Sequence, residues 1–368
     1  MRKLLIVLAS CAALLPAIVF AGPISSGAIF LLLPSFQRPH PHDSSESHRP
    51  VNKGHVELAA GRYVRENEDL VVAGTPQLTL RRTYYSDWRV RTSFGVGTMQ
   101  AADWYVVGDG KTFKWIRLVR PGETQIKFER TSAGSTVLNA MYRHHSSDVD
   151  WNYARLGWTG FDWALRLRSG ALARFLPCGP DVKSVCSILS YRDADGHVTS
   201  YRRDAAGRLL RIVAQPDRWI AFEYDAGNRV SRASDSTGHE VTYDYGDRGR
   251  LVGVKRNGAL THRYTYTERD EMATIVEPGI DIENTFDENG RCIRQTNRHG
   301  DGSEPYVFNF TYRVEGVQVV QTDSRRSDGT WVRYAFKDGR TIAETWGSEG
   351  YQPATFLFDR DPASQEVV

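Results

Sequence analysis

The chain has 368 residues, of which 25% are charged and 40% hydrophobic, enough to bury a sizeable core. The formal net charge is only +3 and the two signs are interspersed, so no basic patch for nucleic acid is predicted. The 17 tyrosines and 9 tryptophans, against 4 methionines, favour β-sheets over helical bundles. We therefore expect an all-β protein that does not bind nucleic acid.

The first 21 residues predict a secretory signal peptide. A charged pair, Arg2-Lys3, precedes a long apolar run that ends in small residues at Ala21-Gly22. Cys11 offers an alternative, because Leu8-Ala9-Ser10-Cys11 resembles a bacterial lipoprotein box. The apolar run continues past Cys11, so we expect cleavage near Ala21. The expected location is the periplasm, the cell surface or the medium, with membrane contact only through this segment.

Residues 22–54 predict a disordered linker, because they are rich in Pro, His, Ser and charge and offer little to bury. His40, His42 and His48 could hold a metal, but a solvated tail is the simpler interpretation. Two β-rich regions are expected to follow, a module at 55–185 and a repeat-based sheet at 186–368.

The sheet prediction rests on a repeated unit: a strand-like stretch ending in Tyr or Phe, an Asp-x-x-Gly turn, then Arg and an apolar residue. Asp bonds its own backbone in such a turn, and Gly takes the positive φ. Three closing glycines lie 20 and 22 residues apart. Each unit predicts a β-hairpin, and successive hairpins predict one antiparallel sheet. The turn residues assigned in this way are Asp204, Gly207, Asp225, Gly227, Asp247, Gly249, Asp287, Gly290, Asp338 and Gly339.

This pattern resembles the YD-repeat (Rhs) family, in which Tyr-Asp-x-x-Gly-Arg-Leu recurs at about this period. The resemblance covers residues 191–368, although the copy after Tyr266 loses both the glycine and the Arg-Leu pair. Residues 56–97 also resemble the module that precedes the repeats in Rhs proteins, through Pro76-Gln-Leu78-Thr-Leu80-Arg-Arg82-Thr-Tyr84 and Phe94-Gly95-Val96-Gly97.

The resemblance implies a hollow shell of β-strands, which in the family often encloses a C-terminal toxin domain. Asp361-Pro362 lacks the Gly-Leu that follows at the family's cleavage segment, and we expect an ordinary turn there. We expect a partial shell without effector activity. Phe358-Asp359 begins a unit whose return strand is missing, so the last strand is expected to self-associate or to bind a partner chain.

The cysteines suggest one bridge. Cys178 and Cys186 close a short loop, and a disulfide is expected in an exported chain, the alternative being two free thiols. Cys292 takes the Leu position of its Arg-Leu pair and is expected to be a small buried hydrophobe.

The residues that could form a metal site or a catalytic site are each expected to have a structural role instead. His144-His145 with Asp148 and Asp150 could bind a metal, but neighbours on a strand point to opposite faces, so we expect an exposed loop. The repeat aspartates are expected to make turns. The sequence lacks a nucleophile elbow, a phosphate-binding glycine loop and a His-Glu-x-x-His helix. We predict no catalytic site, no cofactor and no metal.

Four aromatic residues, Trp151, Tyr153, Trp158 and Trp163, could form a platform for sugar rings, the alternative being core packing. Our leading hypothesis is an exported, non-catalytic YD-repeat scaffold, an orphan or truncated Rhs shell at the envelope or surface. The alternative hypothesis is a glycan-binding surface module that uses these aromatic residues.

Overall fold

The computed structural model describes residues 51, 54–109, 112–121, 125–144, 151–177, 185–214 and 217–358. The predicted signal peptide and nearly all of the predicted linker lie outside them. The described elements are β-strands and one short 3-10 turn at Asp247–Gly249, which confirms the all-β prediction. Within these residues, no helix is long and apolar enough to cross a membrane.

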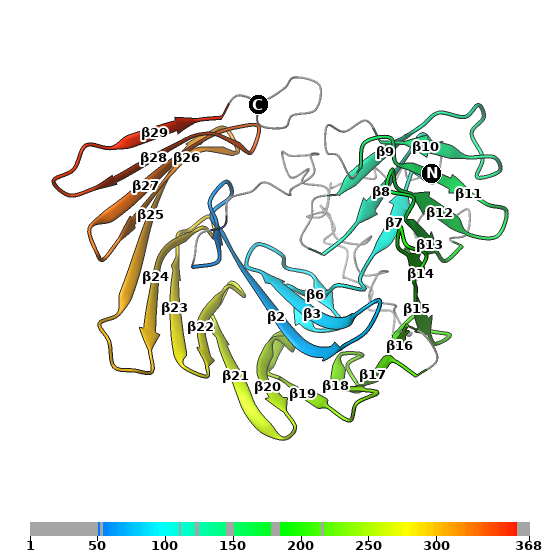
Figure 1. Ribbon diagram of the computed structural model, residues 1–368, viewed down its shortest axis with the longest axis horizontal. Helices are drawn as coiled ribbons and strands as arrows, with labels where there is room; N and C mark the ends of the chain where they lie inside the picture. Colours follow the sequence, from blue (N-terminus) through cyan, green and yellow to red (C-terminus); the bar gives the residue numbers. More distant parts are fainter. Residues whose placement is uncertain are drawn as a thin grey trace, which may run out of the picture.

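The repeats form one antiparallel sheet that bends into a broad arc (Figure 1). Each strand from β15 onward pairs with its neighbours in sequence, so the predicted hairpin repeat sheet is confirmed. Its strands are β15 (Val198–Arg203), β16 (Leu209–Val213), β17 (Trp219–Tyr224), β18 (Val230–Asp235), β19 (Glu240–Tyr245), β20 (Leu251–Arg256), β21 (Ala259–Tyr266), β22 (Met272–Glu277), β23 (Ile280–Phe286), β24 (Cys292–His299), β25 (Tyr306–Glu315), β26 (Gln318–Arg326), β27 (Thr330–Lys337), β28 (Arg340–Ser348) and β29 (Ala354–Leu357).

At one end the arc leads into an eight-stranded barrel. It consists of β7 (Tyr105–Gly108), β8 (Trp115–Val119), β9 (Ile126–Arg130), β10 (Met141–Arg143), β11 (Arg155–Trp158), β12 (Trp163–Arg166), β13 (Leu172–Phe175) and β14 (Cys186–Arg192). The ring closes where the start of β14 pairs with β7, placing Cys186 opposite Val106. The end of β14 pairs with β15, so this strand belongs to both the barrel and the arc.

The third part, which we call the inner module, comprises residues 54–103 and lies on the inner side of the arc (Figure 1). It contains β1 (Val56–Glu57), β2 (Arg62–Val72), β3 (Leu78–Tyr85), β4 (Arg91–Thr92), β5 (Gly95–Val96) and β6 (Thr98–Gln100). Its apolar face shares one core with the repeat sheet, in which Tyr63, Leu80 and Phe94 are packed with Val230 and Ile275. The predicted module at 55–185 thus contains two structures, the inner module and most of the barrel.

The turn chemistry of the repeats is clearest at Asp204. Its carboxylate accepts the backbone N–H groups of Ala206 at 3.0 Å and Arg208 at 2.8 Å, and the Arg208 guanidinium at 2.7 Å. Burial alone would raise the pKa of Asp204, but these hydrogen bonds outweigh it and the pKa is lowered. Gly207 closes the turn with φ +83°, where a side chain would be strained. Asp225 and Asp287 bind their own turns in the same way.

Three turn assignments need correction. Gly227 does not take the positive φ of its turn; Asn228 does, at 59°, because asparagine tolerates the left-handed region. Asp247 does not hold the aspartate position of its turn, because Gly246 stands there. The Gly246 N–H donates to the Arg250 carbonyl at 2.9 Å, as the Asp204 N–H donates to the Arg208 carbonyl in its own turn.

The third correction concerns Asp338 and Gly339. They are the two central residues of a tight hairpin turn between paired Lys337 and Arg340, with φ values of 50° and 74°. Positive φ at both positions is typical of a type I′ turn, for which Asp-Gly is a favoured pair. Asp338 is therefore a corner residue and does not cap an Asp-x-x-Gly turn.

Three successive repeat tyrosines, Tyr224, Tyr245 and Tyr266, each join their hairpin to the previous one. The hydroxyl of each donates to the carbonyl of the apolar residue that follows the preceding turn, and the guanidinium of that turn lies over its ring. The hydroxyl-to-carbonyl distances are 2.8 Å for Tyr224–Leu209, 2.8 Å for Tyr245–Val230 and 2.7 Å for Tyr266–Leu251. The guanidinium-to-ring distances are 5.1 Å for Arg208–Tyr224, 4.6 Å for Arg229–Tyr245 and 5.5 Å for Arg250–Tyr266. The Tyr, Arg and apolar positions of the motif therefore act together between neighbouring units.

Candidate functional site

The most elaborate polar structure in the described residues is the interface between the inner module and the repeat sheet. It is built partly from backbone groups that the sheet leaves outside its ladder at β-bulges. Val230 N–H donates to the Ser93 carbonyl at 2.7 Å, and Cys292 N–H donates to the Gly61 carbonyl at 2.8 Å. Both donors occupy the apolar position after a repeat turn. The repeats thus supply both the hairpins and the bonds that hold the inner module.

A buried charge cluster lies at the centre of this interface. An extra residue in β2, between Glu68 and Leu70, directs Asp69 toward Arg82 on β3. The Arg82 guanidinium donates twice to Asp69, once at 2.9 Å, and the Tyr243 hydroxyl of β19 donates to the same carboxylate at 2.6 Å. The Asp69 and Arg82 side chains are 0% and 3% exposed. Burial, and then the Asp69 charge, raise the pKa of Tyr243, which keeps its hydroxyl a donor.

A second buried ion pair crosses the interface further along β2. The guanidinium of Arg65 donates through two nitrogens to Glu277 on β22, with Nε to Oε1 at 3.2 Å. The two side chains are 12% and 10% exposed. A bidentate pair of this kind fixes the orientation of both groups as well as adding attraction.

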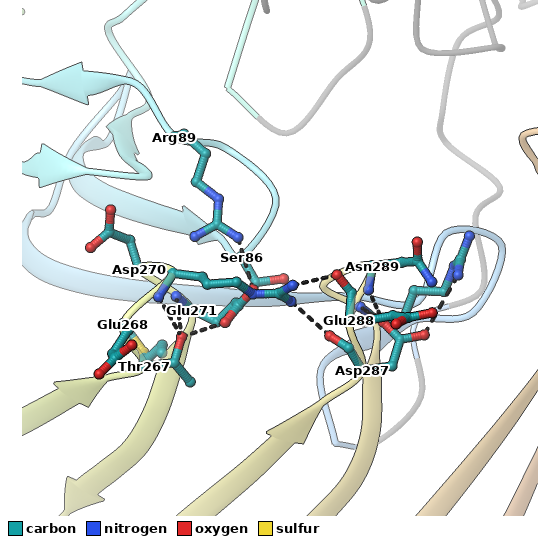
Figure 2. A network of polar contacts seen from close by, with 12 residues as sticks. Ser86, Arg89, Thr267, Glu268, Asp270, Glu271, Asp287, Glu288 and Asn289 are labelled. Atoms are coloured by element: carbon teal, nitrogen blue, oxygen red, sulfur yellow. Dashed lines mark hydrogen bonds and ion pairs between the residues drawn. The ribbon is translucent and has the colours of Figure 1, made fainter.

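The third contact falls on the repeat that departs from the motif (Figure 2). After Tyr266 the aspartate position holds the neutral Thr267 and the arginine position holds the acidic Glu271, so the turn has lost its usual acid and carries an acid where the motif has a base. Arg89 of the inner module reaches Glu271 at 2.9 Å, and Arg269 reaches the same oxygen at 2.9 Å. Burial raises the pKa of Glu271, but its bonds from Thr267 and the two arginines outweigh this and lower it.

The same repeat also receives Tyr84 from β3. The Tyr84 hydroxyl donates to the Asp270 carbonyl at 2.9 Å and accepts the Met272 N–H at 2.9 Å. Asp270 takes the turn's positive φ, at 66°, in place of the missing glycine. The repeat that departs from the motif is therefore also a repeat to which the inner module binds, through Arg89 and Tyr84.

The predicted aromatic platform is not formed as expected. Trp151 and Trp163 lie in the barrel core, 4% and 3% exposed, and Trp163 packs against Trp158 with ring centroids 5.3 Å apart. Indole rings facing inward are what a small barrel needs to fill its interior. Trp158 is half-buried and Tyr153 is 64% exposed. Trp151 and Trp163 cannot meet a sugar ring, and glycan binding remains a prediction that rests on Tyr153 and Trp158.

Two of the cysteines in the predictions, Cys186 and Cys292, lie within the described residues. Cys186 is disulfide-bonded, while Cys178 lies outside the described residues, so the pairing of these two remains a prediction. Cys292 is a free thiol with no exposed surface, as expected for a small buried hydrophobe. Burial raises the pKa of this thiol to about 12, which keeps it protonated and unreactive.

The predicted metal candidates fall only partly within the described residues, and the exposed loop expected for His144 is wrong, because this side chain is buried. His144 is buried and its Nδ1 lies 2.6 Å from the Lys127 carbonyl, while His145, Asp148 and Asp150 lie outside the described residues. An exposed turn brings Asp193, Asp195 and His197 together. There the Asp193 carboxylate already accepts the backbone N–H of His197 at 2.8 Å and contacts its Nδ1 at 3.0 Å, as in the other repeat turns.

Comparison with known families and structures identifies relatives of limited extent. A family model described as a domain of unknown function (DUF6531) matches residues 53–131, and an RHS repeat model matches residues 188–218. The chain is similar to the probable deoxyribonuclease RhsB of Dickeya dadantii (strain 3937), with 45% identity over 51 residues. That match covers 14% of this chain and 4% of the relative, so the chain spans a small fraction of its length.

Two solved structures show weaker likeness. The crystal structure of TcdB2-TccC3-TEV matches 82% of this chain and 19% of that chain, with 9% identity and a TM-score of 0.37. A porin-like protein from Bacteroides uniformis ATCC 8492 matches 75% of this chain and 96% of that chain, with 10% identity and a TM-score of 0.22. The assignment accordingly rests on the sequence matches and the repeated units. The DUF6531 match over residues 53–131 and the RHS repeat match over residues 188–218, together with hairpins that carry the Tyr, Asp, Gly and Arg positions of the motif, show that these parts of the chain are similar to the Rhs, or YD-repeat, family.

Proposed function

We propose that this Rhs shell-type protein is an exported, non-catalytic scaffold of the cell envelope or surface. The observation that supports it most is the way the inner module is fastened to the arc. Arg65 pairs with Glu277 across the interface, and the Asp69–Arg82 pair inside the inner module accepts the Tyr243 hydroxyl of the repeat sheet. These side chains are engaged in joining the inner module to the repeat sheet, as a structural role requires.

The non-catalytic part of the proposal can be tested against the activity in the name of the relative RhsB, a probable deoxyribonuclease. Purified full-length protein is incubated with plasmid DNA and magnesium, with a known nuclease as positive control. A scaffold leaves the DNA intact over hours at micromolar protein. Cleavage that co-purifies with the protein would overturn the scaffold role.

Export is tested by sequencing the N-terminus of the protein recovered from fractionated cells. We expect a new N-terminus near Ala21, because the charged pair Arg2-Lys3 and the following apolar run form a secretory signal. The variant Cys11→Ser separates the two modes of export. It leaves processing unchanged if the signal is cleaved near Ala21, and abolishes membrane anchoring if Cys11 carries a lipid. A retained Met1 would contradict export by cleavage.

We further propose that β29 is the surface through which copies associate. Among the described residues it pairs with β28 alone, and its Phe356 and Leu357 are 56% and 79% exposed. Apolar side chains on an unpaired edge favour pairing with another strand. Light scattering after size exclusion should show dimers or larger species at micromolar concentration, and Leu357→Lys should shift them toward monomer.

The matched control for this surface is Val317→Lys. Val317 is 81% exposed but lies in the turn between β25 and β26, where its backbone borders no open strand edge. It is expected to leave the size distribution unchanged. A wild-type protein that stays monomeric on concentration would refute association through β29.

A further inference from the structure

Two histidines border the buried Arg65–Glu277 pair, one on each side of the interface. His55 precedes β1 in the inner module, and its Nε2 lies 2.7 Å from Nη1 of Arg65. His262 is on β21 of the repeat sheet, 8% exposed, and its Nε2 lies 3.7 Å from Oε1 of Glu277. Each ring therefore contacts one member of the same ion pair.

The contact between His55 and Arg65 requires a neutral ring. A guanidinium has only donors, so Nε2 of His55 must offer its lone pair, with the ring proton on Nδ1. Protonation would place an N–H opposite an N–H and bring two positive charges into contact. The hydrogen bond would then be lost, and Arg65 would be repelled from its position.

The surroundings of His262 also favour the neutral ring. Its Nδ1 lies 2.9 Å from Oγ1 of Thr261, and its Nε2 lies 3.3 Å from Nδ2 of Asn67 on β2. The ring thus donates within β21 and accepts across the interface. Once charged, Nε2 becomes a donor, loses Asn67 and competes with Arg65 for Glu277. Protonation of either histidine therefore acts against the same cross-interface pair.

Burial and the charges around the two rings also favour their neutral forms. Burial and then the positive charge of Arg65 lower the pKa of His55, against a smaller opposite effect of Glu277. Burial lowers the pKa of His262, where Glu277 on β22 and Asp69 on β2 raise it and Arg82 on β3 and Arg256 on β20 lower it. In the unfolded chain both rings titrate near their usual pKa of about 6.5. Because the pKa is lower in the folded state than in the unfolded chain, the stability from the neutral rings is complete above the unfolded pKa. It is lost as the pH falls from there through the folded pKa.

We propose that His55 and His262 form an acid-sensitive latch between the inner module and the repeat sheet. At neutral pH the two neutral rings support the Arg65–Glu277 pair, and in acid their protonation releases β2 from β21 and β22. The latch gives the protein a way to loosen its inner module in an acidic environment without unfolding the barrel.

Hydrogen–deuterium exchange on the full chain tests the latch, with rates corrected for the chemical effect of pH. Protection of the β2 amides should fall about five- to tenfold between about pH 7.5 and about pH 5, the effect expected when a hydrogen bond across the interface is lost as the histidines take up protons. Protection of β8 and β9 in the barrel should change little and serves as an internal reference. The double variant His55→Gln and His262→Gln should remove the pH-dependent loss in β2.

His299→Gln is the matched control, because His299 is exposed at the end of β24. It should retain the full pH-dependent loss. If the barrel amides of the double variant are unprotected at neutral pH, the variant has not folded. Each single variant is then measured instead and should remove part of the pH-dependent loss in β2. A wild-type β2 whose protection does not respond to acid overturns the latch, as does a folded double variant that loses protection as the wild type does.

Discussion

Arg82→Met is expected to lower the free energy of unfolding by about 3–5 kcal/mol, because it leaves a buried carboxylate without its cation. Asp69 has no exposed side-chain surface, and Arg82 supplies two of the three hydrogen bonds described for its carboxylate. Tyr243 alone cannot neutralise the remaining charge. Denaturant unfolding, followed by the fluorescence of the tryptophans, measures the change.

The neighbouring residue provides the control. Arg81 forms an ion pair with Glu68, and both side chains are nearly half exposed, at 47% and 46%. Solvent screens such a pair, so Arg81→Met should cost less than about 1 kcal/mol. Equal losses for the two variants would mean that Asp69 and Arg82 are not buried together, and the docking of the inner module would be wrong at its centre.

Gly95→Ala is expected to cost about 3 kcal/mol or more, from two sources that add. Gly95 has φ +90°, which costs a non-glycine residue about 1–2 kcal/mol. A Cβ at this position would also lie 2.5 Å from the Gly249 carbonyl oxygen of the repeat sheet, and a backbone atom cannot move aside easily. The variant should therefore unfold at a lower denaturant concentration, or expose the interface to proteases.

Gly170→Ala separates the two sources. Gly170 has nearly the same φ, +92°, in the turn between β12 and β13, but a Cβ there would meet nothing within 4 Å. It should show only the backbone cost of about 1–2 kcal/mol. If both variants lose the same stability, the inner module does not approach the repeat turn at Gly249 as closely as described.

The repeat period predicted the hairpins and the antiparallel sheet well, because both depend on local chemistry within one unit. Single turn positions were harder to assign. Asn228 and Asp270 take the positive φ that the motif gives to glycine, and Gly246 stands in an aspartate position. Asn and Asp tolerate the left-handed region, so the residue that closes a turn is not fixed by a search for glycine alone.

The tryptophan assignments failed for a different reason. Alternation along a strand shows that two faces differ, but it does not say which face is covered. Closure of β7–β14 into a barrel made the inner face a core and buried Trp151 and Trp163. That closure depends on a pairing between β7 and β14, strands far apart in the sequence, and leaves no local signal.

The interface itself was missed, because its partners are distant in the chain. Arg65 and Glu277 are separated by 212 positions, and neither stands in a motif. One signal was present: the copy after Tyr266 lost its glycine and its Arg-Leu pair. In the structure this altered repeat contacts Arg89 and Tyr84 of the inner module. A repeat that departs from its family pattern is thus a useful place to look for a binding partner.

A double-mutant cycle between Arg89 and Glu271 tests most directly whether the inner module is docked on this repeat. The two residues lie 182 positions apart and meet only if the inner module occupies the inner side of the arc as described. Unfolding free energies of the wild type, Arg89→Gln, Glu271→Gln and the double variant give the coupling energy. We expect a favourable coupling of about 0.5–3 kcal/mol, as measured for residues in contact. Losses that add to within about 0.3–0.5 kcal/mol would contradict the docking.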